Sequence, residues 1–220
     1  MKKNNIILII IIIIIIIILY KPTNKSLFTN NYIIDGDTIV QKYKDVGEYS
    51  RFNYKTKRSL HWYNLQIIDH IKKSKNNKKI LMLGVALGGM IIHMLDEDKN
   101  IHITGVDISD ENFTLVRQYS DVNRLGLIKE DAMKYIANTN EKYNIIICDL
   151  FIGLNMPDFV LTNTFLNKIR QMLLPAGNFY INTVNRSDAL SIIKQTFVND
   201  IITTSTNNFN NLIFVTVKNA

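Results

Sequence analysis

The feature that most constrains this chain is the stretch Lys78 to Gly89, KKILMLGVALGG, in which an apolar run breaks into a glycine loop. Ile80 to Leu83 is typical of a short strand that is buried on both faces. Gly84 and Gly88 allow the backbone to turn tightly and to approach a bound group. Met90 to Leu95 can then begin a helix whose first amides face that group. The stretch therefore predicts a strand, a ligand-contacting loop and a helix.

A second strand-like run, Ile101 to Val106, ends in Asp107, roughly 20 residues beyond the loop. At this spacing an acidic side chain can accept hydrogen bonds from the hydroxyl groups of a ribose. The glycine loop alone is weak evidence. The two signals together indicate a nucleoside-binding β-α-β unit.

Strand and helix patterns alternate from this unit to the end of the chain, which predicts a mostly parallel sheet with helices on both faces. Only Ser205 to Asn211 separates the last two strands, so these strands are expected to pair antiparallel. The expected strands are Ile80 to Leu83, Ile101 to Val106, Gly126 to Lys129, Tyr143 to Asp149, Gly177 to Asn182, Ile201 to Thr204 and Leu212 to Val217. The expected helices are Met90 to Leu95, Asp110 to Tyr119, Asp131 to Ala137, Phe159 to Leu174 and Ser187 to Phe197.

Ile6 to Tyr20 is an uninterrupted apolar run with lysines on both sides. As a helix it would span about 22 Å, which is short of the roughly 30 Å hydrocarbon core of a bilayer. Flanking lysines can snorkel and the bilayer can thin, so the segment can still cross. No small-residue cleavage site follows, which favours an uncleaved transmembrane helix over a cleaved signal peptide. The near balance of lysines on the two sides leaves the orientation open.

Between this run and the glycine loop, short β-like pieces and turn residues in Asn31 to Tyr54 predict a small hairpin region. Arg58 to Lys72 carries apolar residues at helical spacing and is expected to form a helix. We therefore divide the chain into an N-terminal membrane anchor (1–22), a linker with a small β-hairpin region (23–56) and a Rossmann-like domain (57–220).

Composition adds a few limits. The 26 Lys and Arg residues exceed the 19 Asp and Glu residues and give a net charge of +7, which favours anionic partners. Many of the lysines lie in the linker before the first sheet strand, where a solvated helix end and loop is the favoured explanation. A single cysteine, Cys148, excludes an internal disulfide and a thiolate-only zinc site. His93 and His102 have no ligand spacing, so we predict no metal.

Acidic residues stand at the carboxyl ends of three successive strands, where open parallel sheets bind their ligands. We assign Asp107 to the ribose hydroxyls. Asp131 is expected to accept from the adenine amino group, with the amide of Ala132 on a ring nitrogen. Asp149 then faces the reacting centre as a substrate ligand or general base. The alternative for Asp107 and Asp131 is that they only cap helices.

The remaining candidate residues complete the two halves of this site. Gly84, Ala86, Gly88 and Ile108 are added to the cofactor-binding set. Tyr63 and Phe151 are candidate substrate residues, although an aromatic cluster on a helix is more often part of a core.

The chain from about residue 31 onward resembles the spermidine synthase-like branch of class I S-adenosylmethionine-dependent transferases. The resemblance is carried by the glycine loop and by the runs IHITGVDIS, EDAMKYI, YNIIICDLFIGLNMP and FLNKIRQMLLPAGNFYIN. It implies a Rossmann-like α/β sheet of about seven strands with an antiparallel last strand. It also implies that Gly84, Asp107, Asp131 and Ala132 bind the nucleoside and that Asp149 is the catalytic carboxylate.

Three departures from the family concern the acceptor half of the site. Aminopropyl transferases have an Asp within the glycine loop, where this chain has Leu87, and a second Asp where it has Ile152. The family's Tyr-His-Glu run is reduced to Tyr63-Asn64-Leu65. A doubly charged polyamine needs opposing carboxylates, so these departures argue against polyamine synthesis.

We therefore expect a membrane-anchored methyltransferase that uses S-adenosylmethionine and acts on an unidentified small-molecule or protein acceptor. The alternatives are an aminopropyl transferase that uses the decarboxylated cofactor and a non-catalytic, membrane-tethered binding module. A nucleic-acid acceptor is disfavoured because Asp149 is followed by Leu-Phe-Ile and not by a Pro-Pro-aromatic loop. A cytosolic catalytic domain is the simplest placement, because the cofactor is made in the cytosol. A homodimer stays open.

Overall fold

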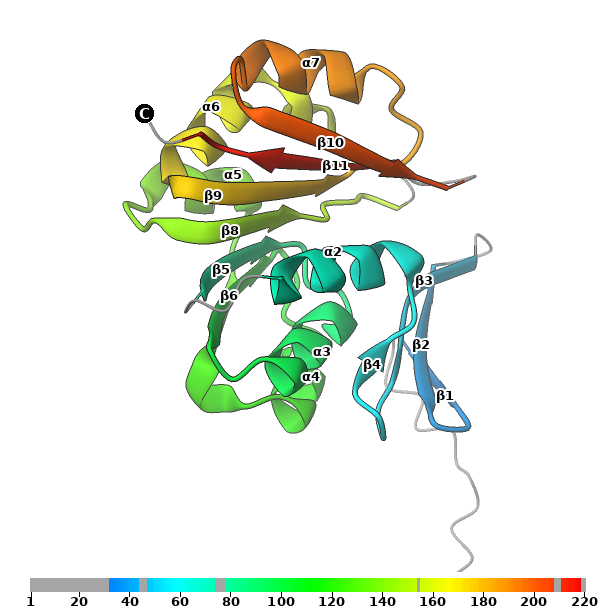
Figure 1. Ribbon diagram of the computed structural model, residues 1–220. Helices are drawn as coiled ribbons and strands as arrows, with labels where there is room; N and C mark the ends of the chain where they lie inside the picture. The colour runs from blue at the N-terminus through cyan, green and yellow to red at the C-terminus, as the bar shows by residue number, and fades with distance from the viewer. Residues whose placement is uncertain (1–31, 44–46, 74–77, 154, 208–210, 219–220) are drawn as a thin grey trace, which may run out of the picture.

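The structure, a computed structural model, describes residues 32–43, 47–73, 78–153, 155–207 and 211–218. A large mixed sheet carries helices on both faces, and a small antiparallel sheet lies beside one of these layers (Figure 1). The predicted anchor, Ile6 to Tyr20, lies outside the described residues. Within the described part of the chain, no helix has the length and apolar character needed to cross a membrane.

The large sheet has seven strands in the order β10-β11-β9-β8-β5-β6-β7. Its members are β5 (Lys78–Leu83), β6 (Ile101–Asp107), β7 (Leu125–Lys129), β8 (Tyr143–Cys148), β9 (Leu173–Asn182), β10 (Ile201–Thr206) and β11 (Asn211–Thr216). The strands from β7 to β9 pair in parallel, whereas β11 pairs antiparallel with both β9 and β10. The predicted Rossmann-like sheet and its antiparallel ending are thereby confirmed.

Alternating side chains of the central strands supply two separate cores. Ile80 and Met82 of β5 belong to the core on one face, whereas Leu81 and Leu83 belong to the core on the other. This is the period of two expected for a strand that is covered on both sides. The first core lies under α2 (Trp62–Lys72), α3 (Gly89–Glu97) and α4 (Phe113–Tyr119). The second lies under α5 (Ala132–Asn138), α6 (Asn163–Met172) and α7 (Ala189–Thr196).

The small sheet consists of β1 (Ile33–Asp35), β2 (Thr38–Tyr43), β3 (Gly47–Asn53) and β4 (Arg58–Ser59), all antiparallel to their neighbours. It packs against the start of α3, where Phe52 is fully buried. A Cβ atom on Gly89 would lie 2.9 Å from the Cβ of Phe52, so the first residue of α3 must be small for this contact. The small sheet and α2 thus cover one end of the central strands (Figure 1).

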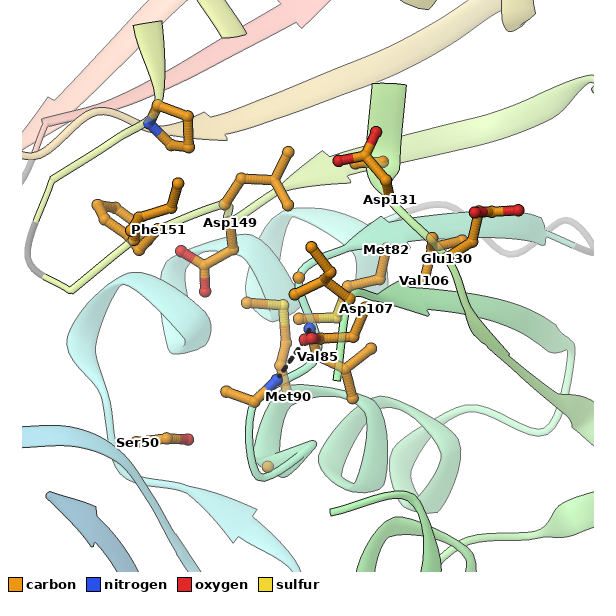
Figure 2. A pocket seen from close by; sticks show the side chains of 18 of the residues that line it. Ser50, Met82, Val85, Met90, Val106, Asp107, Glu130, Asp131, Asp149 and Phe151 are labelled. Atoms are coloured by element: carbon orange, nitrogen blue, oxygen red, sulfur yellow. Dashed lines mark hydrogen bonds between the residues drawn. The ribbon is translucent and has the colours of Figure 1, made fainter. Parts of the chain in front are cut away.

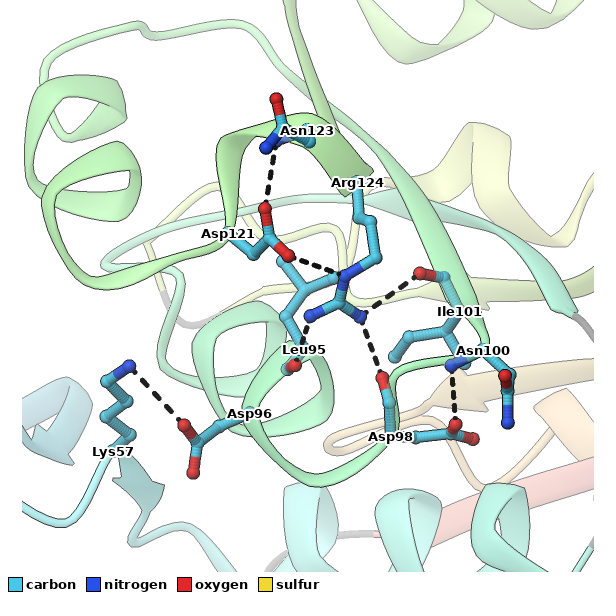
Figure 3. Close-up of polar contacts among 9 residues, drawn as sticks. All are labelled: Lys57, Leu95, Asp96, Asp98, Asn100, Ile101, Asp121, Asn123 and Arg124. Carbon is cyan, nitrogen blue, oxygen red and sulfur yellow. Dashed lines mark hydrogen bonds and ion pairs between the residues drawn. The ribbon is translucent and has the colours of Figure 1, made fainter.

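Arg124 fixes the far end of α3 (Figure 3). Its guanidinium donates to the carbonyl oxygens of Leu95 (2.6 Å) and Asp98 (2.8 Å), at the C-terminus of the helix, where the last carbonyl groups lack intrahelical donors. Asp121 accepts from the Nε atom of the same side chain at 2.9 Å. The cation therefore ties α3 to the beginning of β7 and complements the negative end of the helix dipole.

Two predicted helices differ from the structure by more than a shift of two or three residues at an end. The region Phe159 to Leu174 is divided into a 3-10 helix, η2 (Asp158–Leu161), and α6, because Thr162 begins a new helix by accepting from the amide of Phe165. The helix predicted from Arg58 begins at Trp62, because Arg58 and Ser59 pair with β3 as β4. The division into three segments at residues 22 and 56 stays a prediction.

Gly84 follows β5 at a point where the backbone that follows β8 packs tightly against it. Its amide donates to the carbonyl of Val106 at 2.9 Å, and the amide of Asp149 donates to the carbonyl of Leu83 at 2.9 Å. Gly84 has φ +88°, and a Cβ atom there would lie 2.2 Å from the carbonyl oxygen of Asp149. Only glycine fits this conformation without displacing the end of β8.

We expect Gly84→Ala to lower the free energy of unfolding by about 2–4 kcal/mol, because it adds backbone strain and a backbone clash. Chemical denaturation monitored by circular dichroism measures this change. Gly126→Ala is the matched control, since no atom lies within 4 Å of the added carbon, and it should leave stability unchanged. Equal effects of the two substitutions would contradict this account of the strand ends.

Candidate active site

A cavity opens at the carboxyl ends of β5, β6 and β8, as expected for an open parallel sheet. In Figure 2 it extends from Glu130 and Asp131 on one side, past Asp107, to Asp149 and Phe151 on the other. All the predicted site residues except Gly88 line this cavity: Tyr63, Gly84, Ala86, Asp107, Ile108, Asp131, Ala132, Asp149 and Phe151. Residues that are far apart in the sequence thus lie around one cavity, because the parallel strands that precede them end at the same edge of the sheet.

Asp107 holds the glycine loop in place. Its Oδ2 atom accepts hydrogen bonds from the amides of Val85 (2.7 Å) and Ala86 (3.2 Å). Its Oδ1 atom accepts from the amide of Ser109 at 2.9 Å. Ala86 has φ +49°, a conformation that is uncommon for a residue with a side chain. The carboxylate therefore orders a strained loop, and its roughly four lone-pair sites leave capacity for a ligand hydroxyl.

Asp131 caps α5, which is the alternative role that the sequence indicated for it. Its Oδ1 atom accepts from the amide of Lys134 at 2.9 Å. The side chain is exposed and lies at the wall of the cavity, next to the buried Ala132. Capping occupies one oxygen in the described hydrogen bonds, so the proposed contact with an adenine amino group remains compatible with it.

Asp149 lies where the two halves of the cavity meet. The hydroxyl of Tyr63 on α2 donates to its Oδ2 atom at 3.0 Å. The Nδ2 atom of Asn182, the last residue of β9, donates to its Oδ1 atom at 3.0 Å. Burial raises the pKa of Asp149 to about 6, although both hydrogen bonds act in the opposite direction. A carboxylate with this pKa is ionised at neutral pH and is poised to take up a proton.

Three polar residues of the site were not predicted. Asn182 is the last residue of β9. The expectation that ligands bind at the carboxyl ends of parallel strands, which selected Asp149, therefore applies to Asn182 as well. Ser50 and Asn64 also line the cavity, and they are buried, with exposed fractions of 8% and 5%. They reach the cavity through the docking of β3 and α2, for which the sequence carries no local signal.

Gly88 and Leu87 do not line the cavity. Gly88 is the N-cap of α3 and lies against Val116, and its predicted role in cofactor binding stays a prediction. Leu87 is fully buried in the core beneath α3. Ile152, in contrast, is 73% exposed and belongs to the lining. Of the two apolar residues that stand where aminopropyl transferases have an Asp, Leu87 and Ile152, only Ile152 therefore contributes to the wall of the cavity.

The lining is acidic. Four carboxylates contribute to it, and none of the described lining residues is a Lys, Arg or His. The four are Asp107, Glu130, Asp131 and Asp149. Such a surface favours ligands that carry positive charge or hydrogen-bond donors. Among the described residues, no group of three or more His, Cys, Asp or Glu side chains is arranged to hold a metal ion.

Comparisons with known proteins give a consistent result. Residues 74–214 match the family model described as methyltransferase domain. A probable polyamine aminopropyl transferase of Bifidobacterium longum is 25% identical over 121 residues, which cover 54% of this chain and 27% of that protein. A polyamine aminopropyltransferase of Pseudomonas syringae is 30% identical over 80 residues, which cover 33% of this chain and 28% of that protein. The chain thus matches less than a third of the length of these relatives.

Solved structures share the fold. A probable spermidine synthase from Corynebacterium glutamicum superposes with a TM-score of 0.71 at 17% identity, covering 84% of this chain and 75% of that one. Human methyltransferase-like protein 13, solved with S-adenosylhomocysteine, superposes with a TM-score of 0.57 at 20% identity, covering 74% of this chain and 80% of that one. At these identities the similarity establishes the architecture alone.

We expect Asp149→Asn to stabilise the ligand-free protein at pH 8 by up to about 3 kcal/mol, because it removes the charge of a half-buried, poorly hydrated carboxylate. The folded-state pKa of about 6 exceeds 3.8, the ordinary pKa of an aspartate, so the wild type loses stability as the pH rises between these values. The gain from the substitution should therefore shrink toward zero near pH 4. Thermal unfolding at a series of pH values measures it.

Asp69→Asn, which neutralises an exposed carboxylate on α2, is the control for this experiment. Its stability should follow that of the wild type across the pH series. An Asp149→Asn variant that is less stable than the wild type at pH 8, or whose gain does not change with pH, would contradict the assignment of a raised pKa.

Proposed function

Because the chain belongs to the methyltransferase domain family, we propose that it is an S-adenosylmethionine-dependent methyltransferase of spermidine synthase-like fold. The observation that carries the proposal is that the Asp107-ordered loop and the half-buried Asp149 face one acidic cavity. Membrane attachment through Ile6 to Tyr20 is part of the proposal and rests on the sequence alone. A cytosolic position of the domain is the simplest arrangement.

The residues of the nucleoside half fit an S-adenosyl group. Asp107 supplies acceptors for the ribose hydroxyls, and the exposed side chain of Ile108 offers an apolar surface for the adenine ring. Asp131 and the amide of Ala132 are assigned to the edge of the ring. When bound, S-adenosylmethionine supplies a methyl carbon that is activated by a positively charged sulphur. The carboxylates of the lining offset that charge.

Asp149 is proposed as the proton acceptor on the acceptor side. Its pKa of about 6 leaves it ionised above pH 7, so it can remove a proton from a nucleophilic N–H or O–H group. Tyr63 and Asn182 each donate to one of its oxygens and fix the plane of the carboxylate. Methyl transfer should therefore decline as the pH falls below about 6.

Aminopropyl transfer from the decarboxylated cofactor is the second candidate. It is favoured by the aminopropyl transferase relatives and by the shared fold of the probable spermidine synthase. The exposed Ile152 in the lining argues against a doubly charged amine as the acceptor, because it offers no carboxylate to the second charge. A direct comparison of the two cofactors in calorimetric titrations separates the candidates, because aminopropyl transfer requires the decarboxylated form to bind better.

We expect the full-length chain to bind S-adenosylmethionine and S-adenosylhomocysteine in isothermal titration. Asp107→Asn should weaken both by about tenfold or more, since a charge-assisted hydrogen bond contributes roughly 1.5–3 kcal/mol. Asp110→Asn is the matched control, because Asp110 is an exposed acid three residues away that pairs with Lys129. Absence of binding at millimolar ligand would overturn the proposed function.

A catalytic role of Asp149 is tested against a non-catalytic binding module. Asp149→Asn should reduce methyl transfer by at least roughly a hundredfold, because general-base catalysis contributes on that order, while cofactor affinity changes little. Once an acceptor has been identified, the amount of S-adenosylhomocysteine formed measures the methyl transfer. A binding module would show no transfer with either protein.

A further inference from the structure

The chain that follows β8 places a group of apolar side chains at the mouth of the cavity. Five of them line the cavity and are partly or largely exposed: Leu150, Phe151, Ile152, Pro157 and Phe159. Figure 2 shows Phe151 beside Asp149 at this end of the cavity. We call these five residues the apolar rim.

Ile152 is the part of the rim that a small ligand leaves uncovered. Its exposed fraction of 73% is matched among the large apolar residues of the described chain only by Ile108, which is assigned to the adenine ring. A ligand inside the cavity reaches only the side of Ile152 that lines it, so most of this side chain faces outward. Apolar surface of this kind at the mouth of a cavity is typical of a region that contacts a membrane or another protein.

The length of the N-terminal part of the chain brings lipid within reach of the rim. The proposed function places Ile6 to Tyr20 in a membrane, and eleven residues, Lys21 to Asn31, lie between this run and the first described residue. Eleven residues span at most about 40 Å, since each adds no more than about 3.6 Å. This reach is close to the width of a folded domain of roughly 190 residues, so any face of the domain can contact the bilayer. The exposed apolar rim then favours one face over the others.

The charges around the rim suit a lipid surface without net charge. Asp158, between Pro157 and Phe159, is fully exposed and pairs with Arg186 at 3.1 Å. This pair can remain among the headgroups while the apolar side chains beside it are covered. The lining behind the rim is acidic, with Asp149 and three further carboxylates, and it repels anionic headgroups. Contact with zwitterionic lipid, held by apolar burial, is therefore the favoured arrangement.

Resting on the membrane attachment in the proposed function, we propose that the apolar rim docks against the surface of the bilayer to which the chain is tethered. Ile152 and the rings of Phe151 and Phe159 enter the boundary between headgroups and acyl chains. The cavity then opens toward the lipid.

The test uses the full-length chain reconstituted in phosphatidylcholine vesicles. Ile152→Cys provides a labelling site for a fluorophore, because the native Cys148 is 1% exposed. Interfacial side chains lie about 5–10 Å into the headgroup and acyl boundary, so a nitroxide on the upper acyl chain should lower the emission by about half or more. Iodide in the water should quench this fluorophore only weakly.

Val198→Cys is the matched control, because Val198 is an apolar residue with an exposed fraction of 57% that does not line the cavity. Its fluorophore should be quenched by iodide and not by the lipid nitroxide. Equal lipid quenching at residues 152 and 198 would overturn the proposal, because it would show that no face is preferred. Shielding of residue 152 from both quenchers would also overturn it, since that result is expected when a second copy covers the rim.

A label on Asn155 leaves the five rim residues intact. Asn155 is exposed, and its backbone pairs with that of Ile152. The fluorophore on Asn155→Cys should show the same lipid quenching as the one at residue 152. Adding Ile152→Asp should lower this quenching by about half or more, because a carboxylate is disfavoured in the interface, whereas adding Ile152→Leu should preserve it. Equal quenching with Asp and Leu would contradict the role of the rim.

These results separate the docking from the proposed function. Failure of the wild-type chain to sediment with the vesicles would overturn the membrane attachment and the docking together. Sedimentation without lipid quenching at residues 152 and 155 would overturn the docking alone.

Discussion

The close approach of β5 to its two neighbours is the constraint on which the rest of the structure depends. The amide of Gly84 bonds to the end of β6, and the end of β8 bonds back to Leu83. This arrangement holds only with glycine at residue 84. It places Asp107 and Asp149 at one sheet edge, where Asp107 orders the loop and Asp149 lines the same cavity.

The small sheet and α2, which precede the large sheet in the sequence, are the second feature on which the cavity depends. The small sheet contributes Ser50 and α2 contributes Tyr63 and Asn64 to the lining of the cavity, and the hydroxyl of Tyr63 donates to Asp149. Covering a carboxylate costs stability at neutral pH, and the raised pKa of Asp149 expresses that cost. The same burial gives the group a proton affinity suited to a base. Burial of Asp149 therefore lowers the stability of the protein at neutral pH and raises the proton affinity of the carboxylate at the same time.

The sequence predicted the parts of the site that follow from strand order. Asp107, Asp131 and Asp149 were found because parallel strands end at one edge of a sheet. Asn182 obeys the same rule but lacks a charge to draw attention to it. Asn64 and Ser50 were missed because their position depends on how α2 and β3 dock, which is a tertiary property. The direction of the Leu87 side chain, into the core and not into the cavity, was equally beyond local patterns.

The central claim is that this cavity holds an S-adenosyl group with its reacting end toward Asp149. A crystal structure of the full-length chain with S-adenosylhomocysteine tests it most directly. The account predicts ribose hydroxyls within hydrogen-bonding distance of Asp107, the adenine beside Ile108 and the sulphur atom on the Asp149 side of the loop. A ligand bound elsewhere, or one with its adenine against Tyr63 and Phe151, would contradict the claim.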